Sequence, residues 1–168
     1  MPELAFLSIG SNIGDREANL AGATTALGTY YQINNIQSSS YYETAPLINT
    51  KQPNFLNAVL SCETDFTSFA LLDTIQQVES ILGRPVTRKK NQPRTIDIDI
   101  VTHGDAVIQT NELTIPHPEI LNRKFILIPL EEIAPNFEIP LLKMTATECL
   151  EITNDISRVV KHVMEKQA

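Results

Sequence analysis

FLNAVLSCET (residues 55–64) is followed after three residues by SFALLDTIQQVESIL (residues 68–82), and this pair of segments decides the fold. Successive side chains of a strand point to opposite faces, so the first segment predicts a strand with one apolar core face. That face consists of Leu56, Ala58, Leu60 and Cys62. The second segment predicts a helix, because its apolar residues recur with the spacing of one helix face and Gly83 stands near the expected end.

The segments before residue 55 extend this pair into an alternating pattern. Residues 4–8 predict a short strand, and after a turn Asp15 is placed to cap a helix of about three turns. Residues 31–44 predict another strand, joined to the strand at residues 55–64 by a polar connection. The resulting β–α–β–β–α–β order predicts an α+β fold, a ferredoxin-like split βαβ sandwich with a mainly antiparallel sheet and two helices on one face.

The C-terminal part of the chain has a less regular pattern. A short strand is expected around Val107, and residues 125–133 continue as apolar structure that ends before Pro135. Thr145 is placed to cap a short helix. Residues 156–163 fit either a strand or a second helix, and this choice stays open.

Composition indicates one compact domain. A chain of 168 residues, 42% of them apolar, is long enough to bury a sizeable core. No stretch approaches the roughly 20 apolar residues of a membrane span and no signal peptide is recognisable, so we expect a cytoplasmic protein with no membrane role. Cys62 and Cys149 lie far apart and in no metal-binding spacing, so both are expected to be reduced thiols.

PRTIDIDI (residues 93–100) places two carboxylates in a β-branched run. In a strand, Asp97 and Asp99 share one face and the isoleucines take the other, which is expected to be core. Two like charges roughly 6 Å apart repel by about 3 kcal/mol at an effective dielectric of about 20, and a bound cation reverses that cost. Mg²⁺ needs only one or two carboxylates beside water and phosphate, so the pair predicts a magnesium site. The alternative is a solvated strand face.

A basic cluster precedes this strand. Five of the thirteen Lys and Arg residues fall within residues 84–94, although the formal net charge is −7. A local patch on an acidic protein fits a small anion such as a triphosphate, whereas nucleic acid calls for a broader basic surface, so no nucleic-acid partner is expected. Arg offers a planar fork and Lys a mobile charge to phosphate oxygens. For any one of Arg88, Lys89 and Lys90, a solvated loop residue is the favoured interpretation.

Two further groups of residues suggest ligand contacts. Phe55 and Asn57 share a strand face, where a ring can stack on a flat heterocycle and an amide can exchange hydrogen bonds with it. On these residues alone, a core phenylalanine beside a hydrogen-bonded asparagine is favoured. His117 lies between two prolines and six residues before Arg123. Such a histidine is usually solvated, but near a polyphosphate even its neutral ring can donate to a phosphate oxygen.

Short motifs follow one another along the chain. They are LSIGSNIGDR (7–16), YETAP (42–46), QPNFLNA (52–58), GR (83–84), PRTIDIDI (93–100), PHP (116–118) and RKF (123–125). In this order and spacing they resemble the hydroxymethyl-dihydropterin pyrophosphokinases of folate biosynthesis. The resemblance is strongest over residues 4–135 and becomes unspecific beyond them.

The resemblance implies a single catalytic domain, residues 1–168, with residues 145–168 as a C-terminal extension. The implied reaction moves a pyrophosphoryl group from ATP to the hydroxymethyl of 6-hydroxymethyl-7,8-dihydropterin and releases AMP. Two Mg²⁺ ions would be held by Asp97 and Asp99. The implied catalytic residues are Arg84, Arg94 and Asp97. The implied nucleotide site consists of Arg84, Lys90, Arg94, Ile100, Thr114, His117 and Arg123. The implied pterin site consists of Thr44, Leu47, Phe55, Asn57 and Phe125.

Three positions depart from the family pattern. Asn91 stands where many relatives have Trp, Val86 where some have another basic residue, and Glu112 where some have Arg. These differences bear on ATP affinity or loop closure more than on the type of reaction.

Two other functions would explain part of the sequence pattern. A non-catalytic ligand-binding module would have no use for the whole set of Asp, Arg and His residues. A metal-dependent sugar-nucleotide transferase would explain the paired carboxylates but not Phe55 and Asn57. No apolar surface stripe argues for a protein partner, so small-molecule substrates and a monomer are expected.

Overall fold

The computed structural model describes residues 1–46, 50–83 and 95–164. The strands in this part of the chain are β1 (Glu3–Ser11), β2 (Ile33–Ser38), β3 (Tyr42–Thr44), β4 (Phe55–Thr64), β5 (Asp97–His103), β6 (Ile108–Gln109), β7 (Thr114–Ile115) and β8 (Val159–Lys161). The helices are α1 (Arg16–Leu27), α2 (Ser68–Ile81), α3 (Lys124–Ile133) and α4 (Ala146–Ile152), with a 3₁₀ turn, η1 (Ile120–Asn122), before α3.

The main sheet has β1 and β4 at its centre. Its order is β5-β1-β4-β3-β8, and β2 also pairs with β4. Every one of these pairs is antiparallel. Because β4 lies between β1 and the β2–β3 segment and is antiparallel to both, β1 and that segment run parallel with another strand between them. This is the split βαβ arrangement, so the predicted ferredoxin-like, mainly antiparallel fold is confirmed.

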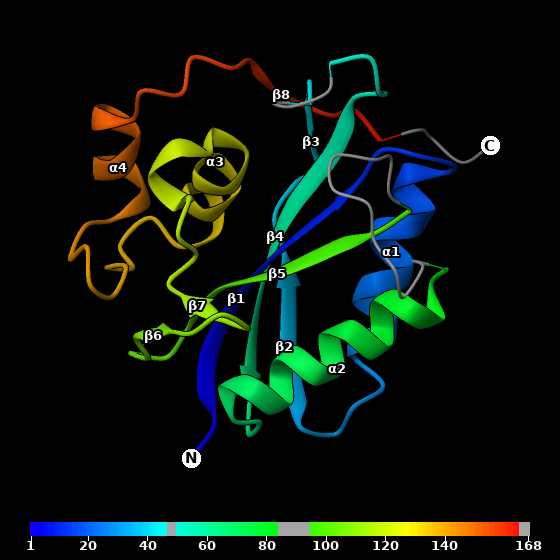
Figure 1. Ribbon diagram of the computed structural model, residues 1–168. Helices are drawn as coiled ribbons and strands as arrows, with labels where there is room; N and C mark the ends of the chain where they lie inside the picture. Colours follow the sequence, from blue (N-terminus) through cyan, green and yellow to red (C-terminus); the bar gives the residue numbers. More distant parts are fainter. Residues whose placement is uncertain (47–49, 84–94, 165–168) are drawn as a thin grey trace.

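Helices cover both faces of the sheet (Figure 1). α1 and α2 pack on one face, over a core that contains Ile9, Leu56 and Ile98. α3 and α4 pack on the other face, over a second core that contains Val59 and Val101. The sequence predicted the two helices on the first face, whereas the second covered face was not foreseen. Of the residues predicted from the sequence to bind ligands, Asp97, Asp99 and Asn57 have their side chains on the α3 side of the sheet.

Local capping explains where three of the helices begin. The Asp15 carboxylate accepts the Ala18 N–H at the start of α1, and the Thr67 hydroxyl accepts the Ala70 N–H at the start of α2. Thr145 forms a reciprocal capping box with Glu148 at the start of α4. The caps predicted at Asp15 and Thr145 are therefore confirmed.

The prediction of one strand over residues 31–44 is wrong, because the segment forms β2 and β3 with a break between them. At the break the Val59 N–H donates to the Ser39 hydroxyl (3.0 Å) instead of to a strand carbonyl. The Ser40 N–H donates to the Glu132 carboxylate at 3.0 Å. At this point side-chain oxygens accept backbone N–H groups in place of the carbonyls of a neighbouring strand, and the strand is interrupted. The open choice for residues 156–163 is resolved by β8, a strand at the sheet edge.

In the described ranges, no helix combines the length and apolar character needed to span a membrane. Both Cys62 and Cys149 are buried free thiols, in agreement with the sequence prediction. Burial raises the pKa of the Cys62 thiol to about 11, so this sulfur stays protonated at neutral pH.

Candidate functional site

A row of register partners crosses the sheet where β5 begins. Asp97 of β5 pairs with Gly10 of β1, Gly10 pairs with Asn57 of β4, and Asn57 pairs with Tyr42 of β3. Partners directly opposite each other point to the same face of a sheet. Neighbouring strands lie about 4.8 Å apart, so the backbones at Asp97 and Asn57 are separated by roughly 10 Å across Gly10. This row therefore brings two of the predicted site residues to one face.

The two carboxylates of β5 share that face, as the strand pattern predicted. Asp97 and Asp99 are half-buried, whereas Ile98 and Ile100 are buried in the core beneath α1 and α2. Val101, which follows on the carboxylate face, is buried in the core beneath α3. The carboxylates of Asp97 and Asp99 therefore lie on the α3 side of the sheet.

A buried carboxylate behind β5 fixes the start of this strand. Glu79 of α2 is 4% exposed and accepts the Ile98 N–H at 3.0 Å. A buried N–H that would otherwise lack an acceptor is satisfied by this carboxyl oxygen. Glu79 therefore positions the segment that carries Asp97 and Asp99. Glu79 was not predicted from the sequence, since a single Glu within a helical stripe carries no local signal.

His117 is held against β5 as a neutral ring. Its backbone N–H donates to Val101 O at 2.9 Å, and its Nδ1 accepts the Glu119 N–H at 3.1 Å. Burial and then the nearby Arg123 charge lower the pKa of His117 to about 4, against the opposing effects of Glu119 and Asp97. Because Nδ1 is an acceptor, the ring hydrogen of the neutral form is on Nε2. His117 is thus set up as a hydrogen-bond donor.

Arg123 and Phe125 lie together at the start of α3. Arg123 is the N-cap residue, and its side chain makes no capping hydrogen bond. The guanidinium carbon instead lies 5.6 Å from the centroid of the Phe125 ring, at cation–π distance. The effect of Arg123 on the His117 pKa shows that these two groups are also near each other. The start of α3 thus combines a cation, an aromatic ring and a neighbouring imidazole.

Asn57 lies at the centre of the predicted pterin residues. It is 4% exposed, and its Nδ2 donates to the Thr44 hydroxyl at 2.8 Å. Gly10 lies so close that a Cβ atom there would stand 2.7 Å from Asn57 Oδ1 and 3.7 Å from Phe55 Cδ1. A glycine in a strand interior often marks such a close approach. That signal was available in the sequence, but it did not identify Asn57 as the neighbour.

The segment before Phe55 is tied to the β1–α1 turn. Asn12 Nδ2 donates to Gln52 Oε1 (2.9 Å) and to Pro53 O (3.1 Å). Arg16 Nη1 donates to Asn54 O (3.2 Å) and to the Glu43 carboxylate (2.8 Å). These contacts border a pocket of ≈ 450 Å³ lined by Asn12, Ile13, Gly14, Arg16, Glu43, Pro53 and Asn54. The turn therefore positions the chain that leads into Phe55, a role that no local sequence pattern predicted.

The other predicted site residues divide into two groups. Thr114 is half-buried in β7, with its hydroxyl directed to Thr110 O at 3.5 Å. The Ile100 side chain lies in the core on the face opposite to the carboxylates, so only its backbone is available to a ligand on the α3 side. The predictions for Leu47, Val86 and Asn91, and those for Arg84, Lys90 and Arg94, lie outside the described residues.

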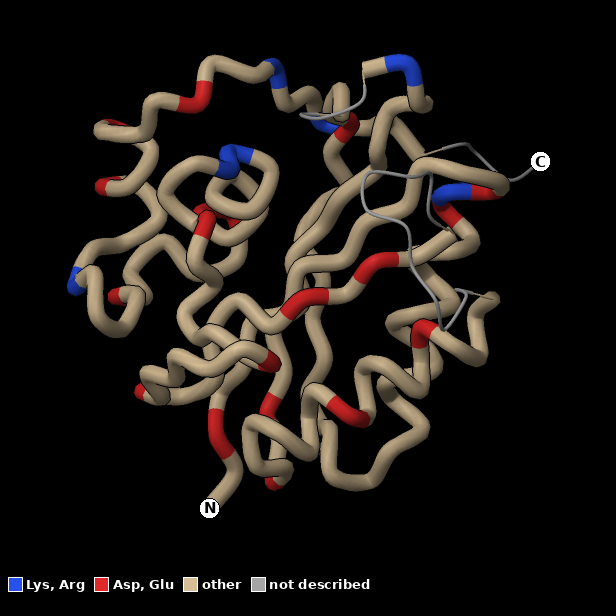
Figure 2. The backbone as a smooth tube through the Cα atoms, viewed as in Figure 1, with Lys and Arg blue, Asp and Glu red and all other residues tan. Residues whose placement is uncertain are grey.

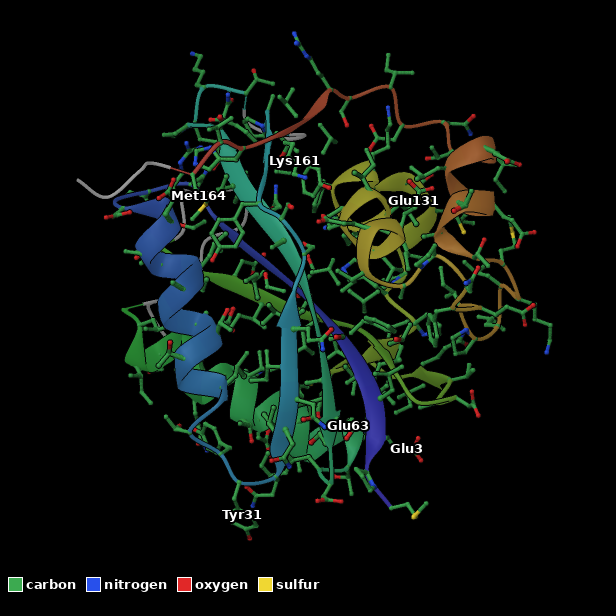
Figure 3. All side chains as sticks on the ribbon, turned by 180° about the vertical axis from the view of Figure 1, so that it is seen from behind. Glu3, Tyr31, Glu63, Glu131, Lys161 and Met164 are labelled. Carbon is green, nitrogen blue, oxygen red and sulfur yellow. The ribbon has the colours of Figure 1, made fainter. Side chains whose placement is uncertain are left out.

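Charge is unevenly distributed over the described chain. In the lower part of Figure 2, around the N-terminus, the charged residues that are drawn are all acidic, while the described Lys and Arg residues lie higher. Figure 3 places Glu3 and Glu63 at the lower end, and Lys161 at the upper end, near the helix that carries Glu131. An anionic ligand is thus repelled least at the end where α3 begins.

The chain is similar in sequence to known proteins. Residues 6–135 match the family model described as 7,8-dihydro-6-hydroxymethylpterin-pyrophosphokinase (HPPK). The chain is 36% identical over 136 residues to the 2-amino-4-hydroxy-6-hydroxymethyldihydropteridine pyrophosphokinase of Haemophilus influenzae. The aligned residues cover 81% of this chain and 84% of that protein. It is 40% identical over 139 residues to the pyrophosphokinase of the same name from Bacillus subtilis, with 82% of each chain covered.

Among solved structures, the chain is similar to wild-type HPPK-DHPS of Plasmodium falciparum with pteroate. The TM-score is 0.71 at 16% sequence identity, and the match covers 90% of this chain and 42% of that longer chain. At this identity the likeness supports the fold alone.

Proposed function

Because this chain belongs to the 7,8-dihydro-6-hydroxymethylpterin-pyrophosphokinase family, we propose that it transfers the pyrophosphoryl group of ATP to the hydroxymethyl of 6-hydroxymethyl-7,8-dihydropterin. The products are AMP and the dihydropterin diphosphate, and the enzyme is an ATP-dependent diphosphotransferase of folate biosynthesis. The observation that carries the proposal is the row of register partners from Asp97 through Gly10 to Asn57. This row puts the carboxylate of Asp97 and the amide proposed to bind the heterocycle on one face of the sheet.

Asp97 and Asp99 are the proposed holders of Mg²⁺. Within residues 1–46, 50–83 and 95–164 no group of three or more metal-ligating side chains occurs. Mg²⁺ fits nonetheless, since it uses one or two carboxylates and takes its remaining ligands from water and substrate phosphates. The bound ion would offset charge on the triphosphate and on the leaving AMP. The proposal of two ions rests on the family resemblance, and Asp97 is proposed to act in catalysis together with Arg84 and Arg94.

The start of α3 is the proposed contact for phosphate oxygens. Arg123 and Lys124 place two cations at a helix N-terminus, an end that favours anions through the positive partial charge of the helix dipole. The Nε2–H of neutral His117 adds a donor beside Arg123, and Thr114 and the backbone of Ile100 complete the described part of the nucleotide site. Arg84, Lys90 and Arg94 are proposed to clamp the phosphates and belong to the undescribed segment.

The pterin is proposed to lie between Phe55 and Phe125, with its edge hydrogen-bonded by Asn57. The bond from Asn57 Nδ2 to Thr44 supports this, since it fixes the amide so that Oδ1 is the acceptor offered toward Gly10. Arg123 covers one face of the Phe125 ring, so the heterocycle is expected to use the other face. Leu47, also proposed for this site, lies outside the described residues.

The test is an incubation of the purified chain with Mg²⁺, ATP and the reduced hydroxymethyl pterin, with the nucleotide products separated by chromatography. AMP that appears only when pterin and Mg²⁺ are both present is the expected result. ADP would mean ordinary phosphoryl transfer, and pterin binding without any nucleotide product would mean a binding module. Sedimentation of the same sample tests the further proposal that the chain is a monomer.

A further inference from the structure

α3 begins without a cap of its own. The residue at the N-cap position is Arg123, whose guanidinium has no acceptor to offer the helix N–H groups and lies near the Phe125 ring. Lys124 follows as the first helical residue, so two cations stand where the helix already carries positive partial charge. A helix start of this kind is unfavourable unless another part of the molecule supplies an acceptor, preferably an anionic one.

Asp155, from the segment after α4, supplies that acceptor. Its Oδ2 accepts the Lys124 N–H at 2.8 Å, and its Oδ1 accepts the Ser157 N–H at 2.9 Å. The Lys124 ammonium donates in turn to Ser157 O at 3.2 Å. Burial by itself would raise the pKa of the Asp155 carboxyl, but the hydrogen bonds from the Lys124 and Ser157 backbone and the Lys124 charge hold that pKa below its usual value. Asp155 is therefore an ionised cap for α3, and it lies 31 residues after Lys124 in the sequence.

The segment that carries Asp155 also reaches β3, the strand that contributes Thr44 to the opposite side of the proposed pterin site. Figure 1 shows it running from α4 past the start of α3 to β8, beside β3. There β8 pairs with β3, with Val159 opposite Thr44. At the α4 end, the Thr153 hydroxyl donates to Leu121 O, just ahead of α3. Residues 153–161 thus connect the segment around Phe125 to the strand of Thr44, and they lie beyond the family match at residues 6–135.

We propose that Asp155 is a positioning residue of the pterin site: by capping α3 from the C-terminal segment, it holds Arg123 and Phe125 at the separation from Thr44 that substrate binding requires. The inference rests on the proposed function, which places a pterin between these walls. Asp155 is only half-buried and lies outside both hydrophobic cores, so its removal leaves no core cavity. What is lost is the acceptor for Lys124 N–H and the anion that offsets the two cations.

The test compares Asp155→Ala, Asp155→Asn and a control, Thr67→Ala, in the full chain. Thr67 caps α2 through the Ala70 N–H at 3.2 Å, so the control also removes a side-chain cap, at a typical cost of about 1 kcal/mol. Asp155→Ala is expected to raise the pterin KM about tenfold while kcat changes less than about threefold, which corresponds to roughly 1.4 kcal/mol of lost binding. Asp155→Asn keeps one of the two acceptor oxygens and loses the negative charge, so it should recover only part of the pterin KM, to about two- to fourfold above the wild-type value. Thr67→Ala should leave the pterin KM unchanged.

A pterin KM for Asp155→Ala equal to that of Thr67→Ala, in enzyme that forms AMP normally, would overturn the inference and leave the proposed function intact. If the wild type binds pterin without forming AMP, the proposed function fails, and the dissociation constant of pterin replaces KM in the same comparison. If the wild type does not bind pterin, both fail. Should Asp155→Ala not fold, Asp155→Asn carries the test: a two- to fourfold rise in pterin KM together with faster hydrogen exchange at the Lys124 amide is expected, and no change in either contradicts the role.

Discussion

Gly10 and Asn57 are register partners on adjacent strands, and a Cβ atom on Gly10 would stand 2.7 Å from Asn57 Oδ1. The contact is with a buried amide whose other end is fixed by Thr44 at 2.8 Å. Asn57 therefore has little room to give way. The absence of a side chain at position 10 is what lets Asn57 Oδ1 point across the row toward Asp97.

Gly10→Ala is expected to damage pterin binding more than folding. The new methyl group forces the Asn57 amide to turn or shift, and overpacking of this kind costs about 1–3 kcal/mol of stability. We expect the pterin KM to rise by at least about tenfold, measured by steady-state kinetics, because a misplaced amide leaves a substrate hydrogen bond unmade.

Gly22→Ala is the matched control for that variant. A Cβ atom at Gly22 in α1 would meet Leu82 Cδ2 at 3.7 Å, an ordinary contact. Alanine in a helix is favoured over glycine by about 0.5–1 kcal/mol, so this variant should be at least as stable as the wild type, with an unchanged pterin KM. Equal KM values for the two variants would remove the argument for the Gly10–Asn57 contact.

Asp97→Asn and Asp99→Asn are expected to lower kcat by about a thousandfold, since several kcal/mol of transition-state charge stabilisation depends on the metal. The concentration of Mg²⁺ needed for half-maximal activity should rise in both variants. Asp105→Asn makes the same chemical change at an exposed position shortly after β5 and should behave like the wild type. Near-normal turnover in Asp97→Asn would refute the metal assignment.

Features made by near neighbours in the sequence were predictable. The caps at Asp15 and Thr145 form with residues only three positions away, and the alternation of Asp97 and Asp99 with the isoleucines follows from the strand period. The cap of α3 has no such local form, because Asp155 is 31 residues from Lys124. Its role appears only when the C-terminal segment is seen to return past the start of α3.

Features that depend on register or on side-chain competition were not predictable. Phe55, Asn57 and Asp97 were each picked out by residue type, but the place of Gly10 between Asn57 and Asp97 requires the pairing of three strands. The break between β2 and β3 depends on Ser39 taking a ladder hydrogen bond, which residue propensities do not show.

His117 is expected to stay neutral down to a pH of about 4, because burial and then Arg123 lower its pKa from the ordinary 6.5. Between these values the unfolded chain binds a proton at this site that the folded chain does not. The His117 contribution to the unfolding free energy therefore increases as the pH rises from about 4 to 6.5 and is constant above that. NMR titration of the ring should show a midpoint near pH 4 and an Nε2–H tautomer at pH 7. A midpoint near 6.5 would contradict the burial of this ring against β5.

Tyr42→Phe is expected to loosen the link between α3 and the sheet. The Tyr42 hydroxyl donates to Glu132 Oε1 at 2.7 Å, and the same carboxylate accepts the Ser40 hydroxyl at 2.7 Å. Burial and then the Glu132 bond raise the pKa of Tyr42 to about 12, so the phenol is a donor throughout the neutral range. A hydrogen bond to a charged acceptor contributes about 1.5–3 kcal/mol, and the exposure of Glu132 puts this one at the lower end.

Denaturant unfolding of Tyr42→Phe, Glu132→Gln and the double variant measures this contribution. We expect a coupling energy of about 1 kcal/mol between Tyr42 and Glu132, because the two side chains share one bond. Tyr31→Phe removes a hydroxyl from a residue that is 85% exposed and should change stability by less than about 0.5 kcal/mol. Strictly additive effects of Tyr42→Phe and Glu132→Gln would show that the charge of Glu132 adds nothing to the bond, since glutamine keeps an oxygen that can accept from the Tyr42 hydroxyl.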